Sequence, residues 1–357
     1  MKVKNKVKMK KIAVLAGDGI GPEVVAEAIK VLQAVDRKHG IGLTFEHALI
    51  GACAIDATGN PLPDETIALC QSSDAVLLGA VGHPRFDNDP TAKVRPEQGL
   101  LKIRKTLGLF ANLRPIRSYP LLYNASPLKN HLVKNVDFIV YRELTGGIYF
   151  GEKGRKNDGK EAFDLCAYST EEVERIAKLA FEAAQKRHKH LTLVDKANVL
   201  ETSRLWREVT GKVAAQYPDV AFDCMFVDNA AMKLIQQPAF FDVVLTENMF
   251  GDILTDEASV ITGSIGLLPS ASVGHKVALF EPIHGSFPEG TGKGIANPMA
   301  TILSAAMLLE HIGYPQPAEE IRAAVMLAIE KGAATSDINA INPLKTSEVG
   351  DFISSKI

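Results

Sequence analysis

The feature that most constrains this chain is a repeated unit made of a short apolar run, a glycine-containing turn and an amphipathic helix. The first such unit has its apolar run at residues 12–16, its turn at 17–21 and a helical pattern that starts at Pro22. Strands that alternate with helices in this way predict an α/β fold. Further along, Ser169 and Glu172 have the spacing of a capping box, so a helix is expected from there.

Length and charge narrow the possibilities. A chain of 357 residues is about twice a typical domain, which favours two domains. The 40 basic and 42 acidic residues nearly cancel, which argues against a nucleic acid or an anionic membrane as partner. The lysine-rich leader, residues 1–11, lacks the pattern of a signal peptide and is expected to be a solvated tail, and no membrane span is expected.

The four cysteines are widely separated and form no CxxC pair. Neither a disulfide framework nor a zinc ribbon is therefore indicated, and a cytoplasmic location is expected.

Two glycine-rich segments resemble nucleotide-binding motifs but have the wrong residues. In the turn at 17–21, the third glycine of a Rossmann fingerprint would fall on Pro22, so a plain strand-to-helix turn is favoured. Residues 154–160 resemble a phosphate-binding loop, but Glu161 stands where a hydroxyl must bind magnesium. We expect this second segment to be an exposed loop.

Two aspartates lie four residues apart, at Asp252 and Asp256. On a helix they share one face, about 6 Å apart, where like charges repel. A divalent cation would remove the repulsion, and ligands that are all oxygen suit Mg²⁺ or Mn²⁺. Taken alone, the motif fits two solvated surface aspartates about equally well.

Charged residues follow several apolar runs, among them Arg142, Lys196 and Asp228. In open α/β sheets ligands bind beyond the carboxyl ends of the strands, so this placement favours a site. Partial burial of Lys196 would lower its pKa toward that of a general base. An ordinary lysine at a strand end is the alternative.

Other residues are candidates for substrate binding. Arg104, Arg114 and Arg142 could form an anion clamp, because guanidinium groups bind carboxylates in a bidentate manner. Tyr149, which is flanked by glycines, could be a general acid or a packed aromatic residue. The glycine-rich residues 281–297 could wrap a flat ligand ahead of a helix capped by Asn297 and Pro298, or form an ordered loop that binds nothing.

Six motifs in sequence order resemble those of the β-decarboxylating dehydrogenases, the isocitrate/isopropylmalate dehydrogenase family. They occupy residues 17–23, 142–151, 195–201, 248–259, 263–272 and 281–298. The resemblance implies a non-Rossmann, two-domain α/β fold with the active site in the interdomain cleft. Residues 1–109 and 263–357 would form a discontinuous cofactor-binding domain. Residues 110–262 would form a second domain with the dimer interface and an arm at about 146–168.

The resemblance also implies an activity. It is the NAD-dependent oxidative decarboxylation of (2R,3S)-3-isopropylmalate to 4-methyl-2-oxopentanoate, a step of leucine biosynthesis, in a homodimer with shared active sites. Isocitrate, homoisocitrate, tartrate and malate are alternative substrates, and a non-catalytic binding protein on the same fold is a more distant alternative.

Individual roles are likewise implied by the resemblance. The three arginines would bind the substrate carboxylates, Lys196 would be the general base and Tyr149 the general acid. Asp252 and Asp256 would bind Mg²⁺ or Mn²⁺ together with Asp228 of the partner subunit, which would also contact the substrate.

Leu100 and Leu101 would pack against an isopropyl group and disfavour isocitrate. Glu289, where this family branch usually has aspartate, would accept the ribose 2′-hydroxyl and favour NAD over NADP. The residues expected to bind the cofactor are Glu97, His284, Gly285, Ser286, Phe287, Pro288, Glu289, Gly290 and Asn297.

Overall fold

The computed structural model describes residues 9–87 and 92–357 and divides into two compact units. Unit 1 comprises Met1–Leu107 and Ser264–Ile357, and unit 2 comprises Gly108–Gly263. The boundaries expected from the sequence, 109/110 and 262/263, lie close to these. Most of the lysine-rich leader falls outside the described residues, but Lys10 and Lys11 belong to the first strand.

Unit 1 is built from both ends of the chain. Its first part contains β1 (Lys10–Gly17), α1 (Gly21–His39), β2 (Leu43–His47), α2 (Ala52–Thr58), α3 (Asp64–Gln71), β3 (Ala75–Ala80), α4 (Pro84–Asp87) and α5 (Pro96–Thr106). Its second part contains η4 (Ile265–Leu267), β11 (Pro269–Val273), β12 (Leu279–Pro282), η5 (Pro288–Gly290), α11 (Met299–His311), α12 (Pro315–Glu330) and α13 (Thr346–Ser354).

The strands of unit 1 lie in the order β2-β1-β3-β12-β11. β1 runs parallel to both of its neighbours, whereas β11 and β12 are antiparallel. Helices α1 and α11 pack on each other and on these strands, and α13 packs on α1. Nearly every residue of α11 is buried, as is usual for a helix that is apolar almost all round.

Unit 2 contains the middle of the chain. Its elements are β4 (Ala111–Arg117), η1 (Pro120–Leu122), α6 (Asn130–Val133), β5 (Asp137–Glu143), η2 (Gly147–Tyr149), β6 (Lys153–Lys156), β7 (Glu161–Asp164), α7 (Thr170–Gln185), β8 (His190–Asp195), α8 (Glu201–Ala214), β9 (Ala221–Phe226), α9 (Val227–Gln236), η3 (Pro238–Phe240), β10 (Val243–Thr246) and α10 (Asn248–Ser259).

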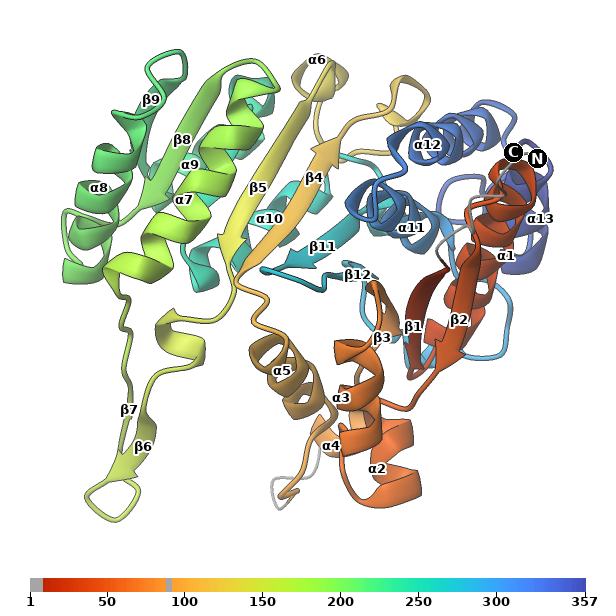
Figure 1. The fold of residues 1–357 in the computed structure, drawn as a ribbon. Helices are drawn as coiled ribbons and strands as arrows, with labels where there is room; N and C mark the ends of the chain where they lie inside the picture. Colours follow the sequence, from red (N-terminus) through yellow and green to blue (C-terminus); the bar gives the residue numbers. More distant parts are fainter. Residues whose placement is uncertain (1–8, 88–91) are drawn as a thin grey trace, which may run out of the picture. The chain divides into compact units, whose positions relative to one another are not determined.

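The strands of unit 2 lie in the order β4-β5-β10-β8-β9, and all pairs are parallel except β4 with β5. Parallel strands bring their carboxyl ends to one edge, where Arg142 and Thr246 pair in register. Helix α7 covers one face of the sheet, and α9 and α10 lie on the other (Figure 1). The predicted capping box is confirmed, because Ser169 and Glu172 exchange side-chain to backbone hydrogen bonds at 3.2 and 2.8 Å.

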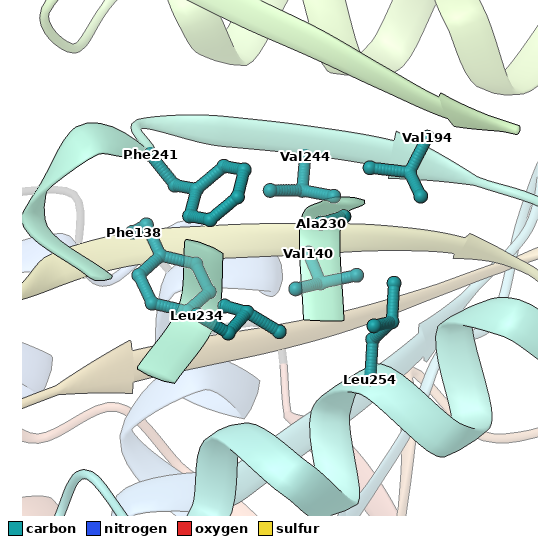
Figure 2. Close-up of a pocket in the computed structure, with 8 residues that line it drawn as sticks. All are labelled: Phe138, Val140, Val194, Ala230, Leu234, Phe241, Val244 and Leu254. Carbon is teal, nitrogen blue, oxygen red and sulfur yellow. The ribbon is translucent and has the colours of Figure 1, made fainter. Parts of the chain in front are cut away.

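The core of unit 2 contains a small packing cavity between α9, α10 and the sheet. A cavity of about 10 Å³ is enclosed by apolar side chains from both layers (Figure 2). Its lining residues are Phe138, Val140, Val194, Ala230, Leu234, Phe241, Val244 and Leu254. Such a wall offers no polar partner that could hold a water molecule, so the cavity is a gap in packing rather than a ligand site.

Several local expectations differ from the structure. Residues 154–160 are only partly a loop, because 154–156 belong to β6 and only 157–160 form the exposed turn of the β6–β7 hairpin, which extends away from the rest of unit 2 (Figure 1). Its turn is made possible by left-handed backbone at Asn157, Asp158 and Gly159. The glycine-rich segment that begins at Glu281 was expected to lack regular structure, but its first two residues end β12.

Asp228 lies in the first turn of α9 rather than at the end of a strand. Among the described residues, no helix combines the length and hydropathy needed to traverse a lipid bilayer.

Candidate active site

Arg142 is the centre of a buried polar cluster in unit 2. It lies near the end of β5 and is 3% exposed. Its Nη1 donates to Oδ1 of Asp252 at 2.5 Å, while Nε and Nη2 donate to Oδ1 of Asn248 at 3.1 and 2.8 Å. Asn248 in turn donates from Nδ2 to the carbonyl oxygen of Gly146 at 3.2 Å. The guanidinium group is therefore fixed by both an ion pair and a neutral amide.

Gly251 is required for this arrangement. A Cβ atom at Gly251 would lie 2.7 Å from Cγ and 2.8 Å from Cβ of Arg142, closer than side-chain atoms approach each other. The glycine of the motif at 248–259 therefore allows α10 to pack directly against the arginine on β5.

A second arginine reaches the same helix from β4. Arg114 donates from Nη1 to Oγ1 of Thr255, and from Nε to Oδ1 of Asn112 at 2.8 Å. Its guanidinium nitrogens lie 3.5 Å from Asp252 and 3.4 Å from Asp256. Asp252 thus lies between two arginines, and Asp256, whose side chain is 69% exposed, lies at the outer end of the cluster.

Tyr149 completes the cluster. Its hydroxyl donates to Oδ2 of Asp252 at 3.0 Å, and the guanidinium carbon of Arg142 lies 5.8 Å from the centre of its ring. Burial, followed by the negative charge of Asp252, raises the pKa of Tyr149. The phenol therefore keeps its proton at neutral pH, as a proton donor must.

Lys196 and Asp228 form a separate pair. Lys196 directly follows β8, and its Nζ lies 2.5 Å from Oδ1 of Asp228 on α9. Its side chain is 28% exposed, in agreement with the expected partial burial. The hydrogen bond from Lys196 lowers the pKa of Asp228, which therefore remains a carboxylate.

Oxygen ligands suited to Mg²⁺ or Mn²⁺ are present, but they are divided between two places. Asp252 and Asp256 lie one turn apart on α10, as their spacing predicts. Within the described part of the chain, no three acidic, histidine or cysteine side chains lie close enough to hold a metal ion. Asp228 therefore does not complete a three-aspartate site within one subunit.

In unit 1, α5 carries Arg104 together with Leu100, Leu101 and Glu97. Arg104 donates from Nη2 to Oε1 of Glu281 at 2.8 Å, and both side chains are nearly buried. Its Nε is buried and has no hydrogen-bond partner among the described residues, which leaves one guanidinium donor unpaired there. Leu100 lies one helical turn before Arg104, and both leucines are only partly buried.

The expected cofactor loop of unit 1 is held by the first turn of α1. The N–H of Ile20 donates to the carbonyl oxygen of Ser286 at 2.9 Å, and the carboxylate of Glu23 accepts from the N–H groups of Gly292 and Gly294 at 2.5 and 3.0 Å. The turn at 17–21 therefore supports this loop.

Two side chains of the loop have polar atoms that bear on ligand binding. Nε2 of His284 is buried and has no hydrogen-bond partner among the described residues, as expected where a ligand supplies one. The Asn297 side chain accepts from the N–H of Met299 at 3.0 Å and donates to Asp337 at 2.9 Å. Asn297 thus accepts from the first N–H of α11, but the helix begins at Met299 with Pro298 as its N-cap, one residue later than expected.

The sequence analysis missed Asn248, Thr255 and Glu281, which are neighbours of the candidate arginines. Asn248 could have been found, because Asn248, Asp252 and Asp256 repeat every four residues and so share one helix face. No local signal pairs Glu281 with Arg104, since 177 positions separate them.

Comparisons with known proteins identify the family of this chain. The family model described as isocitrate/isopropylmalate dehydrogenase matches residues 11–353. The chain belongs to the isocitrate/isopropylmalate dehydrogenase family.

Among relatives, the 3-isopropylmalate dehydrogenase of Bacteroides fragilis is 56% identical over 345 residues, which are 96% of this chain and 97% of the relative. That of Carboxydothermus hydrogenoformans is 54% identical, with coverage of 97% and 94%.

Solved structures of this family are also similar. The isocitrate dehydrogenase from Methylococcus capsulatus has a TM-score of 0.88 at 35% identity, covering 98% of this chain and 99% of that one. The β-decarboxylating dehydrogenase from Thermococcus kodakarensis has a TM-score of 0.80 at 37% identity, with coverage of 98% and 96%. The predicted family and fold class are thus confirmed.

Proposed function

We propose that this protein is a 3-isopropylmalate dehydrogenase. It catalyses the NAD-dependent oxidative decarboxylation of (2R,3S)-3-isopropylmalate to 4-methyl-2-oxopentanoate, a step in leucine biosynthesis. The observation that carries this proposal is the cluster of Arg114, Arg142 and Tyr149 around Asp252, in a chain whose similar relatives bear that name over almost their whole length.

Arginines bind the two carboxylates of the substrate. Arg114 and Arg142 are held in fixed orientations by Asn112 and Asn248, so they lose little freedom when an anion binds. Arg104, on α5, is assigned the third guanidinium group.

Asp252, Asp256 and Asp228 of the partner subunit would hold Mg²⁺ or Mn²⁺. When bound, the divalent cation supplies Lewis acidity that makes the substrate C2 hydroxyl easier to deprotonate. The donor set fits this role because all of its ligands are carboxylate oxygens.

Proton transfer is assigned to two side chains. Lys196 of the partner subunit would accept the proton of the C2 hydroxyl, and NAD, when bound, would supply the acceptor for the C2 hydride. The C3 carboxylate then departs as CO₂, and Tyr149 delivers a proton to C3. The position of Tyr149 suits this donation, because its hydroxyl lies against Asp252 and its ring lies beside Arg142.

The choice of substrate is assigned to α5. Leu100 and Leu101 offer an apolar surface next to Arg104 that suits an isopropyl group, whereas the third carboxylate of isocitrate would lose hydration there without gaining a partner. Isocitrate is the alternative substrate to distinguish, because one structurally similar protein is an isocitrate dehydrogenase.

The choice of cofactor is assigned to the loop at 284–297, with Glu97 on α5. The carboxylate of Glu289 accepts the ribose 2′-hydroxyl of NAD and repels the 2′-phosphate of NADP. The unpartnered Nε2 of His284 supports a ligand at this loop.

We further propose a cytoplasmic homodimer. The helices that carry the metal aspartates expose apolar side chains, with Met232 on α9 and Ile253 on α10 exposed by 53% and 59%. A dimer interface over these helices would bury both side chains. The β6–β7 hairpin would be the arm that contacts the partner.

A substrate panel tests the proposed activity. Appearance of NADH absorbance with Mg²⁺ would be followed for 3-isopropylmalate, isocitrate, homoisocitrate, tartrate and malate. We expect the highest kcat/KM for 3-isopropylmalate, with NAD preferred over NADP. A higher kcat/KM for isocitrate would overturn the substrate assignment, and no turnover of any acid would overturn the enzyme assignment. Lys196→Ala is the control, and we expect it to bind substrate yet lose turnover by about a hundredfold or more.

A further inference from the structure

One aromatic side chain in the proposed cofactor loop has an uncommon conformation. Phe287 has a φ of 39°, in the left-handed region that a phenylalanine rarely adopts, and its side chain is 47% exposed. Strained backbone of this kind persists only where the surroundings hold it, and it is frequent at ligand sites. The surroundings of Phe287 therefore hold its ring in an exposed position, although phenylalanine disfavours this backbone conformation.

Gly290 provides the space for this ring. A Cβ atom at Gly290 would lie 2.4 Å from Cε1 and 2.5 Å from Cδ1 of Phe287, and the next nearest atom is Cγ2 of Ile20 at 3.3 Å. Because only these two ring atoms come so close, the ring meets Gly290 with its Cδ1–Cε1 edge rather than with a face. Any larger residue at 290 would displace the ring.

The support beneath the ring is fixed at several points. The N–H of Gly290 donates to the carbonyl oxygen of Phe287 at 2.9 Å, which closes a tight turn. Ser286 is held by Ile20, and the residues after the turn are held by Glu23. A ring on such a support is oriented before a ligand arrives, so binding costs little side-chain entropy.

The same loop contains an unused polar atom. Burial lowers the pKa of His284, whose imidazole is therefore neutral, and its Nε2 has no partner among the described residues. A half-exposed aromatic ring in this loop suits a planar heterocycle, because such a ligand can stack on it.

We propose that Phe287 stacks against the adenine ring of NAD and that Gly290 is small so that the phenylalanine ring can stand there. Adenine has the π-face that an aromatic side chain binds, and such stacking does not depend on the hydrogen-bonding pattern of the base. The inference rests on the proposed role of this loop in NAD binding and assigns the base-binding contact within it.

Calorimetric binding of ADP-ribose and of nicotinamide mononucleotide separates the two halves of the cofactor. We expect Phe287→Ala to weaken ADP-ribose binding by about tenfold or more and to leave nicotinamide mononucleotide binding unchanged. Phe287→Asn should weaken ADP-ribose binding to the same extent. Because asparagine tolerates the left-handed region, this variant separates the loss of the ring from an effect of backbone strain. Phe287→Tyr should restore affinity.

A double-mutant cycle tests the role of Gly290. Gly290→Ala alone should weaken ADP-ribose binding by displacing the ring, but it should have little further effect once Phe287 is alanine. Phe240→Ala, which removes a partly exposed phenylalanine from unit 2, is the matched control and should not alter ADP-ribose affinity.

Three results would overturn the proposal. The first is ADP-ribose affinity within twofold of the wild type in both Phe287→Ala and Phe287→Asn. The second is an equal loss for both halves of the cofactor, which would indicate a general collapse of the loop. The third is a higher ADP-ribose affinity in Phe287→Ala than in the wild type, when the wild type turns over 3-isopropylmalate with NAD. Failure of the wild type to bind NAD would instead remove the proposed cofactor role of the loop, and this inference with it.

Discussion

Asn248 illustrates how much of the candidate site depends on a residue without charge. Asn248 is 1% exposed, and its side chain accepts two hydrogen bonds from Arg142. The backbone N–H of Asn248 donates to the hydroxyl of Tyr168 at 3.0 Å. An arginine held only by Asp252 could rotate about that contact. With Asn248 in place, the guanidinium plane is fixed and can present its remaining surface to a carboxylate.

We expect Asn248→Ala to raise the KM for the hydroxy diacid by about tenfold or more, because the buried guanidinium group loses two hydrogen bonds and its orientation. The KM for NAD should stay unchanged, which a general loss of structure would not allow. Steady-state kinetics with each substrate varied in turn measure both values. Asn248→Asp keeps the accepting oxygen and should be less impaired, and the exposed Asn130→Ala is the control. An unchanged KM for the diacid in Asn248→Ala would contradict the role.

Among the secondary-structure elements, α10 is central to the candidate site of unit 2. One face of this helix carries Asp252 and Asp256, and its N-terminal end is buried. Glu247, which precedes the first residue of the helix, is 5% exposed. A helix N-terminus favours a negative charge, but burial dominates and raises the pKa of Glu247 from its ordinary value of 4.5 to about 7. The nearby buried carboxylate of Glu143 acts in the same direction.

The raised pKa of Glu247 predicts a pH-dependent stability. The unfolded chain releases this proton at a lower pH than the folded protein does. The contribution of protonated Glu247 to the free energy of unfolding is therefore fully present below about pH 4.5. It is lost as the pH rises to about 7, by on the order of 3 kcal/mol. Glu247→Gln, which mimics the protonated form, should therefore raise the free energy of unfolding at about pH 8 and change it little at about pH 5. Urea denaturation at both pH values measures this difference. Glu201→Gln, at a side chain 84% exposed, is the control; equal effects of Glu247→Gln at both pH values would refute the assignment.

At the scale of the whole molecule, the candidate catalytic groups of unit 2 fall into two sets. Tyr149, Arg142 and Asp252 are joined by direct contacts, whereas Lys196 and Asp228 contact each other. The described residues include no cluster of three metal-ligating side chains that would unite the sets. The proposed dimer would bring the two sets together by pairing one set with the other from a second copy of the chain.

Mixing two inactive variants tests this sharing. If each site takes Lys196 from one chain and Asp252 from the other, a heterodimer of Lys196→Ala and Asp252→Asn chains has one fully intact site and one doubly defective site. Co-refolding equal amounts should therefore restore about a quarter of wild-type turnover. Each variant refolded alone is the control. No recovery despite heterodimers detected by mass spectrometry would place the complete site within one chain.

Features that arise from neighbouring residues can be predicted from the sequence alone. The alternation of apolar runs and amphipathic helices predicted the α/β class, the Ser169–Glu172 spacing predicted a capped helix, and the four-residue spacing placed Asp252 and Asp256 on one face. These features depend on backbone geometry and local hydrogen bonds, so a short window of sequence contains them. The family followed from six motifs in order.

Which of those residues contact one another depends on the packing of the folded chain. Arg142 and Asn248 are 106 positions apart and become neighbours because β5 and β10 pair in the sheet. The edge-on packing of Phe287 against Gly290 and the pairing of Arg104 with Glu281 likewise depend on packing rather than on local pattern. Such contacts are set by how strands pair and helices pack, and no local preference of the chain specifies those distances.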